Sequence, residues 1–496
     1  MSEDEGGDSL SSLGSISHGA GLFFIGRVCR QGIRFITNLI LTRTLGPSLY
    51  GIYAYLIVVF SLFSVFTRLG GDKSVLRYLP EYEDNHKMQT VMLTVAFITS
   101  LVASVIVSGL VYHFAPTISE LTLEEPLFVN VLRVGAIVLP FSTLSNIIFS
   151  SFKAIERIEY NVAVSNIIQP ILRLIFVGGA VLWGYSVIGA VAGLVFAGIL
   201  TFSVSIAVLI RKTDLGLFQQ PTRSEFKRYY DFSLPLTFNQ IGSFLYNRVD
   251  VLMVGFLLSG AAVGVYNIAI MVAGILMLPL SAFNQLFPPI ASKLYHRGDY
   301  TELENVYRTV TRWVFTISLF PGLAVILYTQ EILQVFGEEF ASGVLVLTLF
   351  TIAQLTNCLV GPSGFLLMMT EHQYLTMMNQ LLSGFLNVVL NYLLILQYGL
   401  IGAAMATATI LACINLLRVG QVWYLEGFFP YDRKYIKPIT AGIVSAIIMT
   451  LISLVLSQYL LLLIGGATGA ISFFGCLFLM GFEEEEVDIF ERMVIS

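Results

Sequence analysis

Residues 26–38 read GRVCRQGIRFITN, inside an apolar run near 20–43 that is long enough to cross about 30 Å of hydrocarbon. On a helical wheel, the polar side chains of this stretch fall within about 100° of one another, and they are Arg27, Arg30, Gln31, Arg34 and Asn38. The opposite side is apolar. A charge at bilayer depth costs roughly 2.5 to 3.5 kcal/mol, so charged residues there usually face a wet interior. The stretch therefore predicts a membrane-spanning helix whose polar stripe lines a cavity.

The rest of the chain has the composition of a membrane protein. Its 496 residues are 56% hydrophobic and only 12% charged, and the mean hydropathy is +0.81, which ordinary soluble proteins do not approach. The four cysteines lie in apolar runs, so neither a disulfide framework nor a zinc site is indicated. We predict an all-α polytopic membrane protein with fourteen transmembrane helices, near 20–43, 49–68, 90–113, 127–150, 160–183, 187–210, 232–258, 262–290, 306–328, 342–368, 374–397, 400–424, 436–458 and 460–481.

The distribution of basic residues predicts the orientation of the spans. Alternate connecting segments carry nineteen of the 27 Lys and Arg, whereas the intervening ones carry none; the basic segments are 68–89, 151–160, 211–231, 291–312, 425–437 and the C-terminal tail. The loop 369–373 is an exception, because it should be basic in this alternation and has no Lys or Arg. Because Lys and Arg concentrate in cytoplasmic loops, we expect a multi-pass protein of the cell membrane with both termini cytoplasmic. Residues 1–19 are expected to form a disordered tail, and 482–496 an acidic one.

An internal repeat appears when the chain is shifted by 213 residues. The shift pairs Gly51 with Gly264, Asn166 with Asn379, and Tyr185 with Tyr398. It covers six spans, an even number, so the two copies have the same orientation, and parallel repeats of this kind suggest two lobes with the substrate between them. The predicted parts are an N-lobe, an inter-lobe loop, a C-lobe and a C-terminal helix pair, at 20–213, 214–231, 232–427 and 436–481.

Outside the basic segments, eight arginines and no lysine lie inside the spans or at their edges, at positions 27, 30, 34, 43, 133, 173, 248 and 418. A guanidinium is a planar fork that grips phosphate or carboxylate bidentately, whereas an ammonium is a point charge. The pattern indicates an anionic ligand, such as a phosphate. The candidate substrate-binding residues are Arg30, Arg34, Arg173, Arg248, Asn38 and Arg27.

Structural roles remain open for several of these side chains. Arg27 could snorkel to the surface, and Arg30 could serve an interhelical hydrogen bond. Asp250, two residues after Arg248, could be a coupling site for a proton or cation, or the counter-ion of the arginines. Anchoring at the membrane interface is the simplest role for Arg43, Arg133 and Arg418.

The sequence gives poor support for catalysis. No histidine lies deep in a span, and neither metal-ligand spacing nor a nucleophile or phosphate-loop motif stands out. The predicted extracytoplasmic loops reach only about a dozen residues, which is too short for the catalytic domain of a membrane glycan ligase. We therefore expect neither enzymatic activity nor a cofactor, and nucleic acid is not an expected partner.

Short segments in a fixed order resemble a known family: LGPSLYGIY (45–53), VLRY (75–78), LPL (234–236), NRVD (247–250), VGVYN (263–267), FPP (287–289), VFGEEF (335–340) and YGLIGAA (398–404). Over roughly residues 20–430, they are similar to the polysaccharide-biosynthesis flippases of the multidrug/oligosaccharidyl-lipid/polysaccharide transporter superfamily. The resemblance implies two lobes like those of the superfamily's drug antiporters, the MATE transporters.

The resemblance also implies a function, namely moving a polyprenyl- or dolichyl-linked sugar from the cytoplasmic to the outer leaflet. The expected partners are an anionic lipid-linked glycan, membrane lipid and glycan-assembly enzymes, and the chain is expected to act as a monomer. A MATE-type small-molecule antiporter is the alternative within transport. A membrane glycosyltransferase or ligase is the alternative from another class.

Overall fold

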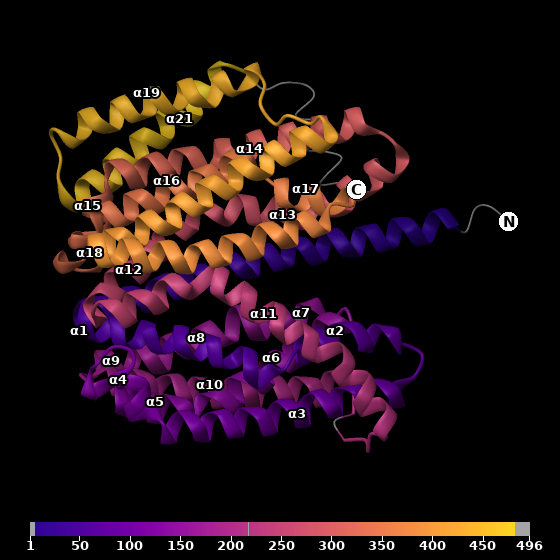
Figure 1. Ribbon diagram of the computed structural model, residues 1–496. Helices are drawn as coiled ribbons and strands as arrows, with labels where there is room; N and C mark the ends of the chain where they lie inside the picture. Colours follow the sequence, from indigo (N-terminus) through magenta and orange to yellow (C-terminus); the bar gives the residue numbers. More distant parts are fainter. Residues whose placement is uncertain (1–4, 217, 482–496) are drawn as a thin grey trace. The chain divides into compact units, whose positions relative to one another are not determined.

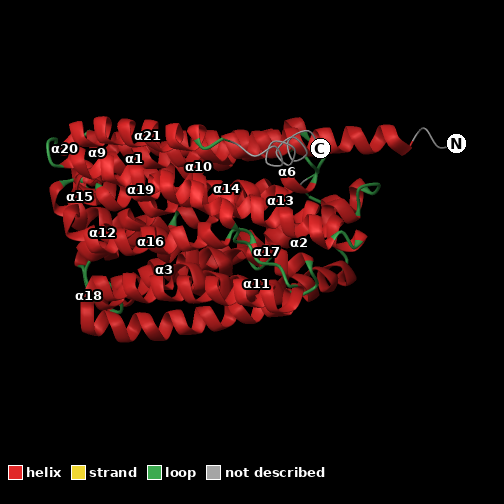
Figure 2. Ribbon diagram, turned by 90° about the horizontal axis from the view of Figure 1, so that it is seen from above, coloured by secondary structure: helices red, strands yellow, loops and turns green. Residues whose placement is uncertain are grey.

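The computed structural model describes residues 5–216 and 218–481, and these residues form helices and loops without strands (Figures 1 and 2). The chain divides into two compact units: His18–Gly264, and Val265–Ser496 together with the first seventeen residues. The all-helical prediction is confirmed.

The His18–Gly264 unit contains every predicted site residue. Its core lies where α2, α3 and α6 pack together, around Leu79, Leu93 and Ile147. Its helices are α1 (Glu5–Arg68, from His18), α2 (Gly71–Glu81), α3 (His86–His113), α4 (Ala115–Glu120), α5 (Pro126–Ala136), α6 (Val138–Ala154), α7 (Ile158–Asn161), α8 (Gln169–Arg173), α9 (Gly179–Leu182), α10 (Val187–Lys212) and α11 (Arg223–Leu257).

The second unit is also helical, and its C-terminal helices α19 and α21 pack against each other and against α14 (Figure 1). Its helices are α12 (Gly260–Ala273, mostly in this unit), α13 (Leu278–Arg297), α14 (Tyr300–Leu327), α15 (Thr329–Phe336), α16 (Val344–Val360), α17 (Ser363–Met369), α18 (Gln373–Glu426), α19 (Ile436–Ser453), α20 (Gln458–Leu460) and α21 (Gly466–Leu479). Six short stretches are 3₁₀- or π-helical: Val162–Ile168, Leu174–Gly178, Gly274–Met277, Glu338–Gly343, Arg433–Tyr435 and Leu461–Gly465.

Ten helices in the described residues are long and apolar enough to cross a membrane, or eleven if the bent pair of α5 and α6 is one span. Two of the ten are 44 and 54 residues long. Each contains one glycine with non-helical backbone angles, Gly46 at φ 69° and Gly399 at φ 57°. Positive φ is accessible to glycine without steric penalty, so these residues divide α1 and α18 into two arms each.

Two parts of the chain differ from the predicted organisation. Residues 5–19 are the first part of α1, in the segment for which the sequence predicts a tail. The boundary between the units falls at Gly264, so the first unit also includes α11, which the sequence assigns to the C-lobe. The physical reason is that α11 packs against α2 and α3. The predicted acidic tail, 482–496, lies outside the described residues.

The contact between α2 and α11 depends on Gly70. Its φ of 70° is in the left-handed region, and a Cβ there would overlap the carbonyl oxygen of Ser233 on α11. The first turn of α11 is held by a capping box, in which the Thr222 hydroxyl accepts from the Glu225 backbone N–H and the Glu225 carboxylate accepts from that of Thr222. The backbone conformation of Gly70 therefore allows the close approach of α2 and α11, and the capping box fixes where α11 begins.

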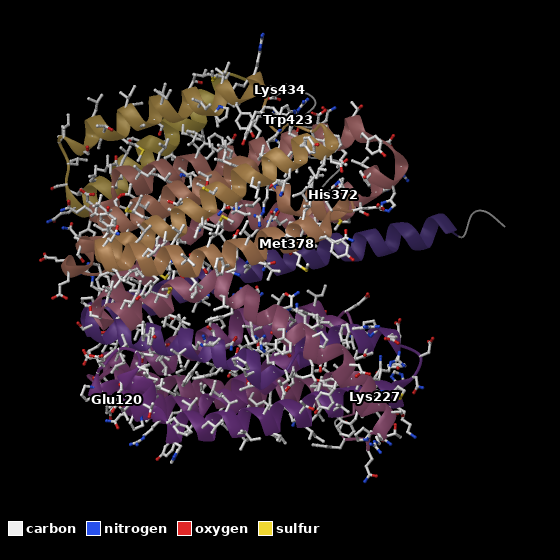
Figure 3. All side chains as sticks on the ribbon, viewed as in Figure 1. Glu120, Lys227, His372, Met378, Trp423 and Lys434 are labelled. Atoms are coloured by element: carbon white, nitrogen blue, oxygen red, sulfur yellow. The ribbon has the colours of Figure 1, made fainter. Side chains whose placement is uncertain are left out.

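The ends of the His18–Gly264 unit can be assigned from Figure 3. Lys227, at the start of α11, lies at the opposite end of the helices from Glu120, the last residue of the short helix α4 that follows α3. The basic segment 211–231 and the segment 114–126, which lacks Lys and Arg, are therefore at opposite ends of this unit. This placement agrees with the alternation of basic segments along the chain.

Candidate functional site

The polar stripe of α1 is half-buried to exposed. Arg34 is exposed, whereas Arg27, Arg30 and Asn38 are half-buried. The Asn38 amide donates to the Arg34 carbonyl oxygen at 2.8 Å, and its side-chain oxygen accepts from the Tyr50 hydroxyl at 3.0 Å. Tyr50 lies beyond the Gly46 break and is fully buried. Asn38 therefore ties the two arms of α1 together beside Arg34.

Arg173 ends α8, which is a single α-helical turn between two π-helical segments, η1 (Val162–Ile168) and η2 (Leu174–Gly178). The backbone angles at Ile168 and Gln169, before Pro170, and at Leu174, after it, are all helical. π-helical turns are rare and frequently occur at functional sites. The Arg173 side chain is half-buried.

Arg248 and Asp250 lie on α11 with different environments. Arg248 is half-buried, whereas Asp250 is only 4% exposed, and its Oδ1 accepts from the Val251 backbone N–H at 2.8 Å. The acid is thus oriented by the backbone of its own helix.

Four of the predicted residues form one electrostatic group. Arg34 experiences the positive charges of Arg173, Arg30 and Arg248, and Arg30 experiences those of Arg27 and Arg173. Between the described residues, no hydrogen bond or ion pair engages the guanidinium groups of Arg30, Arg34, Arg173 or Arg248. We call these four residues the arginine cluster. Like charges held together in a partly dehydrated environment repel one another, so a bound anion would stabilise them.

Sequence reasoning missed several residues next to the cluster. The buried Tyr53 experiences the charges of Arg173 and Arg34. Lys153, at the end of α6, experiences the charges of Lys73, Arg30 and Asp72. A line of electrostatically coupled side chains therefore connects the arginine cluster with α2.

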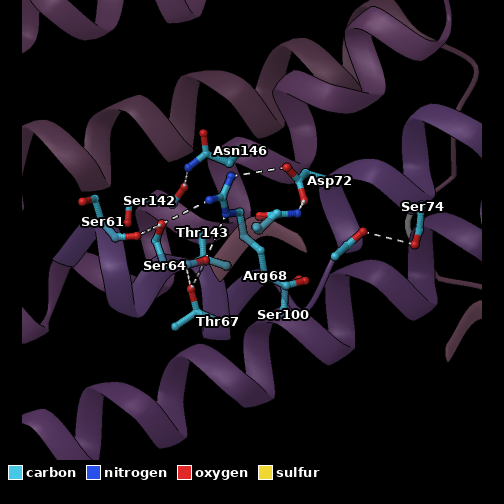
Figure 4. Close-up of polar contacts among 12 residues, drawn as sticks. Ser61, Ser64, Thr67, Arg68, Asp72, Ser74, Ser100, Ser142, Thr143 and Asn146 are labelled. Atoms are coloured by element: carbon cyan, nitrogen blue, oxygen red, sulfur yellow. Dashed lines mark hydrogen bonds and ion pairs between the residues drawn. The ribbon is translucent and has the colours of Figure 1, made fainter. Parts of the chain in front are cut away.

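Asp72 is the acid in this line, and it is held by two partners. The Arg68 guanidinium contacts one of its carboxylate oxygens at 3.3 Å, and the Gln240 amide donates to the other at 3.2 Å (Figure 4). Arg68 also donates to the Ser64 carbonyl oxygen at 3.0 Å. The spacing of four residues between Arg68 and Asp72 was the sequence signal for this pair.

Four of the eight arginines lie outside the cluster, namely Arg27 on α1 and the three described next. Arg43 is exposed, and the Arg133 guanidinium lies 5.6 Å from the centre of the Tyr112 ring. Arg418 belongs to the second unit. The cation–π contact of Arg133 fits the predicted anchoring role.

As for metals, the described residues contain no group of three or more His, Cys, Asp or Glu side chains that could hold an ion.

Comparisons with known proteins match more than half of the chain to one family. The model of the "Polysaccharide biosynthesis protein" family matches residues 16–294, and the "MatE" model matches residues 235–393. The chain is 28% identical over 271 residues to the probable low-salt glycan biosynthesis flippase Agl15 of Haloferax volcanii, over 53% of this chain and 55% of that protein. It is 25% identical over 267 residues to the probable flippase AglR of the same organism, over 52% and 55%. The chain thus spans about half the length of these relatives.

A solved structure of the lipid II flippase MurJ, in an inward closed conformation, has the same fold. Its TM-score is 0.69 at 15% sequence identity, and the match covers 96% of this chain and 100% of that one. All three of these proteins are named as flippases or probable flippases, in agreement with the prediction that the chain is no enzyme.

Proposed function

Because the chain belongs to the polysaccharide biosynthesis protein family of the multidrug/oligosaccharidyl-lipid/polysaccharide superfamily, we propose that it is a lipid-linked glycan flippase. Its substrate would be a sugar or oligosaccharide joined to a polyprenyl or dolichyl phosphate or diphosphate. Transport from the cytoplasmic to the outer leaflet of the cell membrane would serve polysaccharide assembly or protein glycosylation. Agl15 and AglR are both named as probable flippases, which supports this proposal.

The arginine cluster is the observation that supports the proposal most strongly. Arg34 experiences the charges of the three other guanidinium groups, which come from α1, α8 and α11, and the described residues supply no acid that pairs with these four groups. A phosphate or diphosphate headgroup would satisfy these groups with charge-assisted hydrogen bonds. Arg27 and Asn38 would support the cluster, and Asp250 would balance its charge.

Fourteen spans suit this function. The number follows if α1 and α18 count as two spans each, divided at Gly46 and Gly399, and if α11 and the α5–α6 pair each count as one. An even number of spans keeps both termini on one side, which the basic segments assign to the cytoplasm. Two parallel six-helix lobes would alternate access, with α19 and α21 as an additional pair. A single chain containing both lobes would function as a monomer.

The membrane potential could supply the driving force. With a cell interior negative by about 100 mV, outward movement of each phosphate charge is favoured by about 2.3 kcal/mol, unless protein charges move with it. In sealed vesicles, collapse of the potential should then stop transport. Transport that continues without a potential but stops without a sodium or proton gradient would contradict this mechanism.

The test is the location of lipid-linked glycans in cells that lack the gene. We expect them to accumulate on the cytoplasmic face, and we expect wild type to reverse this while Arg34→Ala does not. Arg211→Gln, at the exposed end of α10, is the matched control and should behave like wild type. Unchanged lipid-linked glycans together with altered drug sensitivity would instead indicate the antiporter.

A further inference from the structure

A groove on α2 and α11 is separate from the arginine cluster and rich in basic and aromatic side chains. It consists of two adjoining cavities of about 480 and 450 Å³, which share Arg77 and Phe232 as lining residues. Small-molecule sites commonly have volumes of this size. Lys227 lines the second cavity, so the groove lies at the end of the unit opposite Glu120 (Figure 3). The basic segments 68–89 and 211–231 assign this end to the cytoplasm, where a glycan lipid would be loaded.

The arginines of the groove are stacked on aromatic rings. The Arg77 guanidinium lies 4.3 Å from the centre of the Phe232 ring and 5.4 Å from that of Tyr78. Arg228 lies 5.6 Å from the Tyr78 ring and pairs with Glu81. Stacking holds a guanidinium in one orientation while its N–H edge stays available for hydrogen bonds. The side chain of Arg77 is 51% exposed, and its contact with Glu81 is long, at 3.7 Å.

The groove is positively charged overall and also contains amides. Among the described residues, Asp231 is the one acid that lines the two cavities, against four basic side chains: Lys73, Arg77, Lys227 and Arg228. Asn239 and Gln240 line the first cavity. Gln240 donates its amide N–H to Asp72, which leaves its oxygen as an acceptor. Amides pair with sugar hydroxyls, and an aromatic ring packs on the apolar face of a pyranose ring.

The groove lies within reach of a headgroup held by the arginine cluster. Lys153, at the end of α6, experiences the charges of both Lys73, which lines the groove, and Arg30 of the cluster. Gln240 and Arg248 are eight residues apart on α11, or about 12 Å along the helix. A lipid phosphate at the cluster would thus place the attached sugars toward the groove.

We propose that this groove binds the sugar part of the substrate and favours a sugar that carries a carboxylate, of the uronic acid type. The inference rests on the proposed flippase function. Arg77 would grip the carboxylate bidentately, Phe232 would support the ring, and Asn239 with Gln240 would bind hydroxyls. The groove would select the glycan, and the arginine cluster would bind the phosphate that all carriers share.

The experiment measures binding to the purified full-length chain in nanodiscs of phosphatidylcholine. The probes are polyprenyl phosphate, polyprenyl-phosphate glucose and polyprenyl-phosphate glucuronic acid. We expect wild type to bind the glucuronic acid lipid about tenfold more tightly than the glucose lipid, the size of one charge-assisted contact. Arg77→Gln should reduce this preference to less than about twofold and leave polyprenyl phosphate binding unchanged. Asn239→Ala should weaken both sugar lipids equally, and Arg211→Gln should change nothing.

Each failure has a separate meaning. If wild type binds the two sugar lipids equally while Arg34→Gln weakens all three probes, the groove is no carboxylate site and the flippase proposal stands. If polyprenyl phosphate does not bind, or binds independently of Arg34, the flippase proposal itself fails. If phosphatidylglycerol in the nanodisc abolishes the preference of wild type, the groove binds lipid headgroups and the sugar assignment is overturned.

Discussion

Arg34 in the first unit and Arg312 in the second are both arginines on apolar helices, with opposite surroundings. Arg312 is buried on α14, and its guanidinium contacts Asp432, in the loop before α19, at 2.8 Å. Arg34 is exposed beside three other arginines. The neighbouring Arg308 repeats the paired pattern, with Glu304 at 2.5 Å and the Phe429 carbonyl oxygen at 2.8 Å. The paired arginines stabilise the loop before α19, whereas the guanidinium groups of the arginine cluster remain available to bind a ligand.

The largest expected effect is on the paired side. Arg312→Ala leaves Asp432 without the guanidinium it contacts, and removing one member of a buried ion pair costs about 3 kcal/mol. We expect a clear fall in the melting temperature of the purified protein in detergent. Replacing both residues with leucine should be less harmful than either single change. A melting temperature equal to that of wild type would show that the pair does not fasten the loop.

Arg34→Gln should have the reverse profile. Losing charge-assisted hydrogen bonds to a phosphate costs about 2 kcal/mol, so binding of polyprenyl phosphate should weaken roughly thirtyfold. The melting temperature should stay constant or rise, because like-charge repulsion is relieved. Equilibrium binding and thermal denaturation of one preparation measure both. If Arg34→Gln lowers the melting temperature as much as Arg312→Ala does, Arg34 has a structural role and the two regions do not differ in this respect.

Stabilisation of the protein by an added anion should also distinguish the two regions, with a smaller effect than the substitutions above. Pyrophosphate at ten times its Kd should stabilise wild type by about 1.4 kcal/mol, because it binds the folded state. Arg34→Gln should show little of this stabilisation, and Arg312→Ala should retain it in full. Thermal denaturation with and without pyrophosphate, compared with chloride at equal ionic strength, gives the answer. Equal stabilisation of all three proteins would mean that the anion binds elsewhere.

Asp250→Asn should have the smallest effect. Asparagine keeps the oxygen that accepts from the Val251 N–H, so the stability change should be within about 1 kcal/mol. Transport by a flippase should fall less than with Arg34→Gln. A MATE-type antiporter would instead lose all coupling between its substrate and the proton or cation. Complete loss of transport with Asp250→Asn and normal transport with Arg34→Gln would therefore favour the antiporter.

The arginines of the cluster are candidates that the sequence alone could name, whereas the contacts around them were missed. Arg30, Arg34, Arg173 and Arg248 come from three distant segments, and arginine without lysine inside apolar runs was enough to group them. The Arg68–Asp72–Gln240 contacts were missed because 68–89 was assigned to a loop, although the Gly70 conformation starts a helix there. The role of Asn38 depends on the Gly46 break, since only a turned chain places Tyr50 within 3.0 Å of it. Hydropathy identifies the membrane spans in a sequence. It does not identify breaks such as the one at Gly46, because these depend on how the chain packs.

Because π-helical segments lie on either side of Arg173, the direction of its side chain depends on the number of residues in these segments. A π turn accommodates one residue more than an α turn, and one residue corresponds to about 100° of helix rotation. A related chain with a one-residue deletion within 162–168 would keep an arginine in the aligned position but turn it away from Arg34. In this segment, insertions and deletions could therefore alter the site during evolution as strongly as substitutions do.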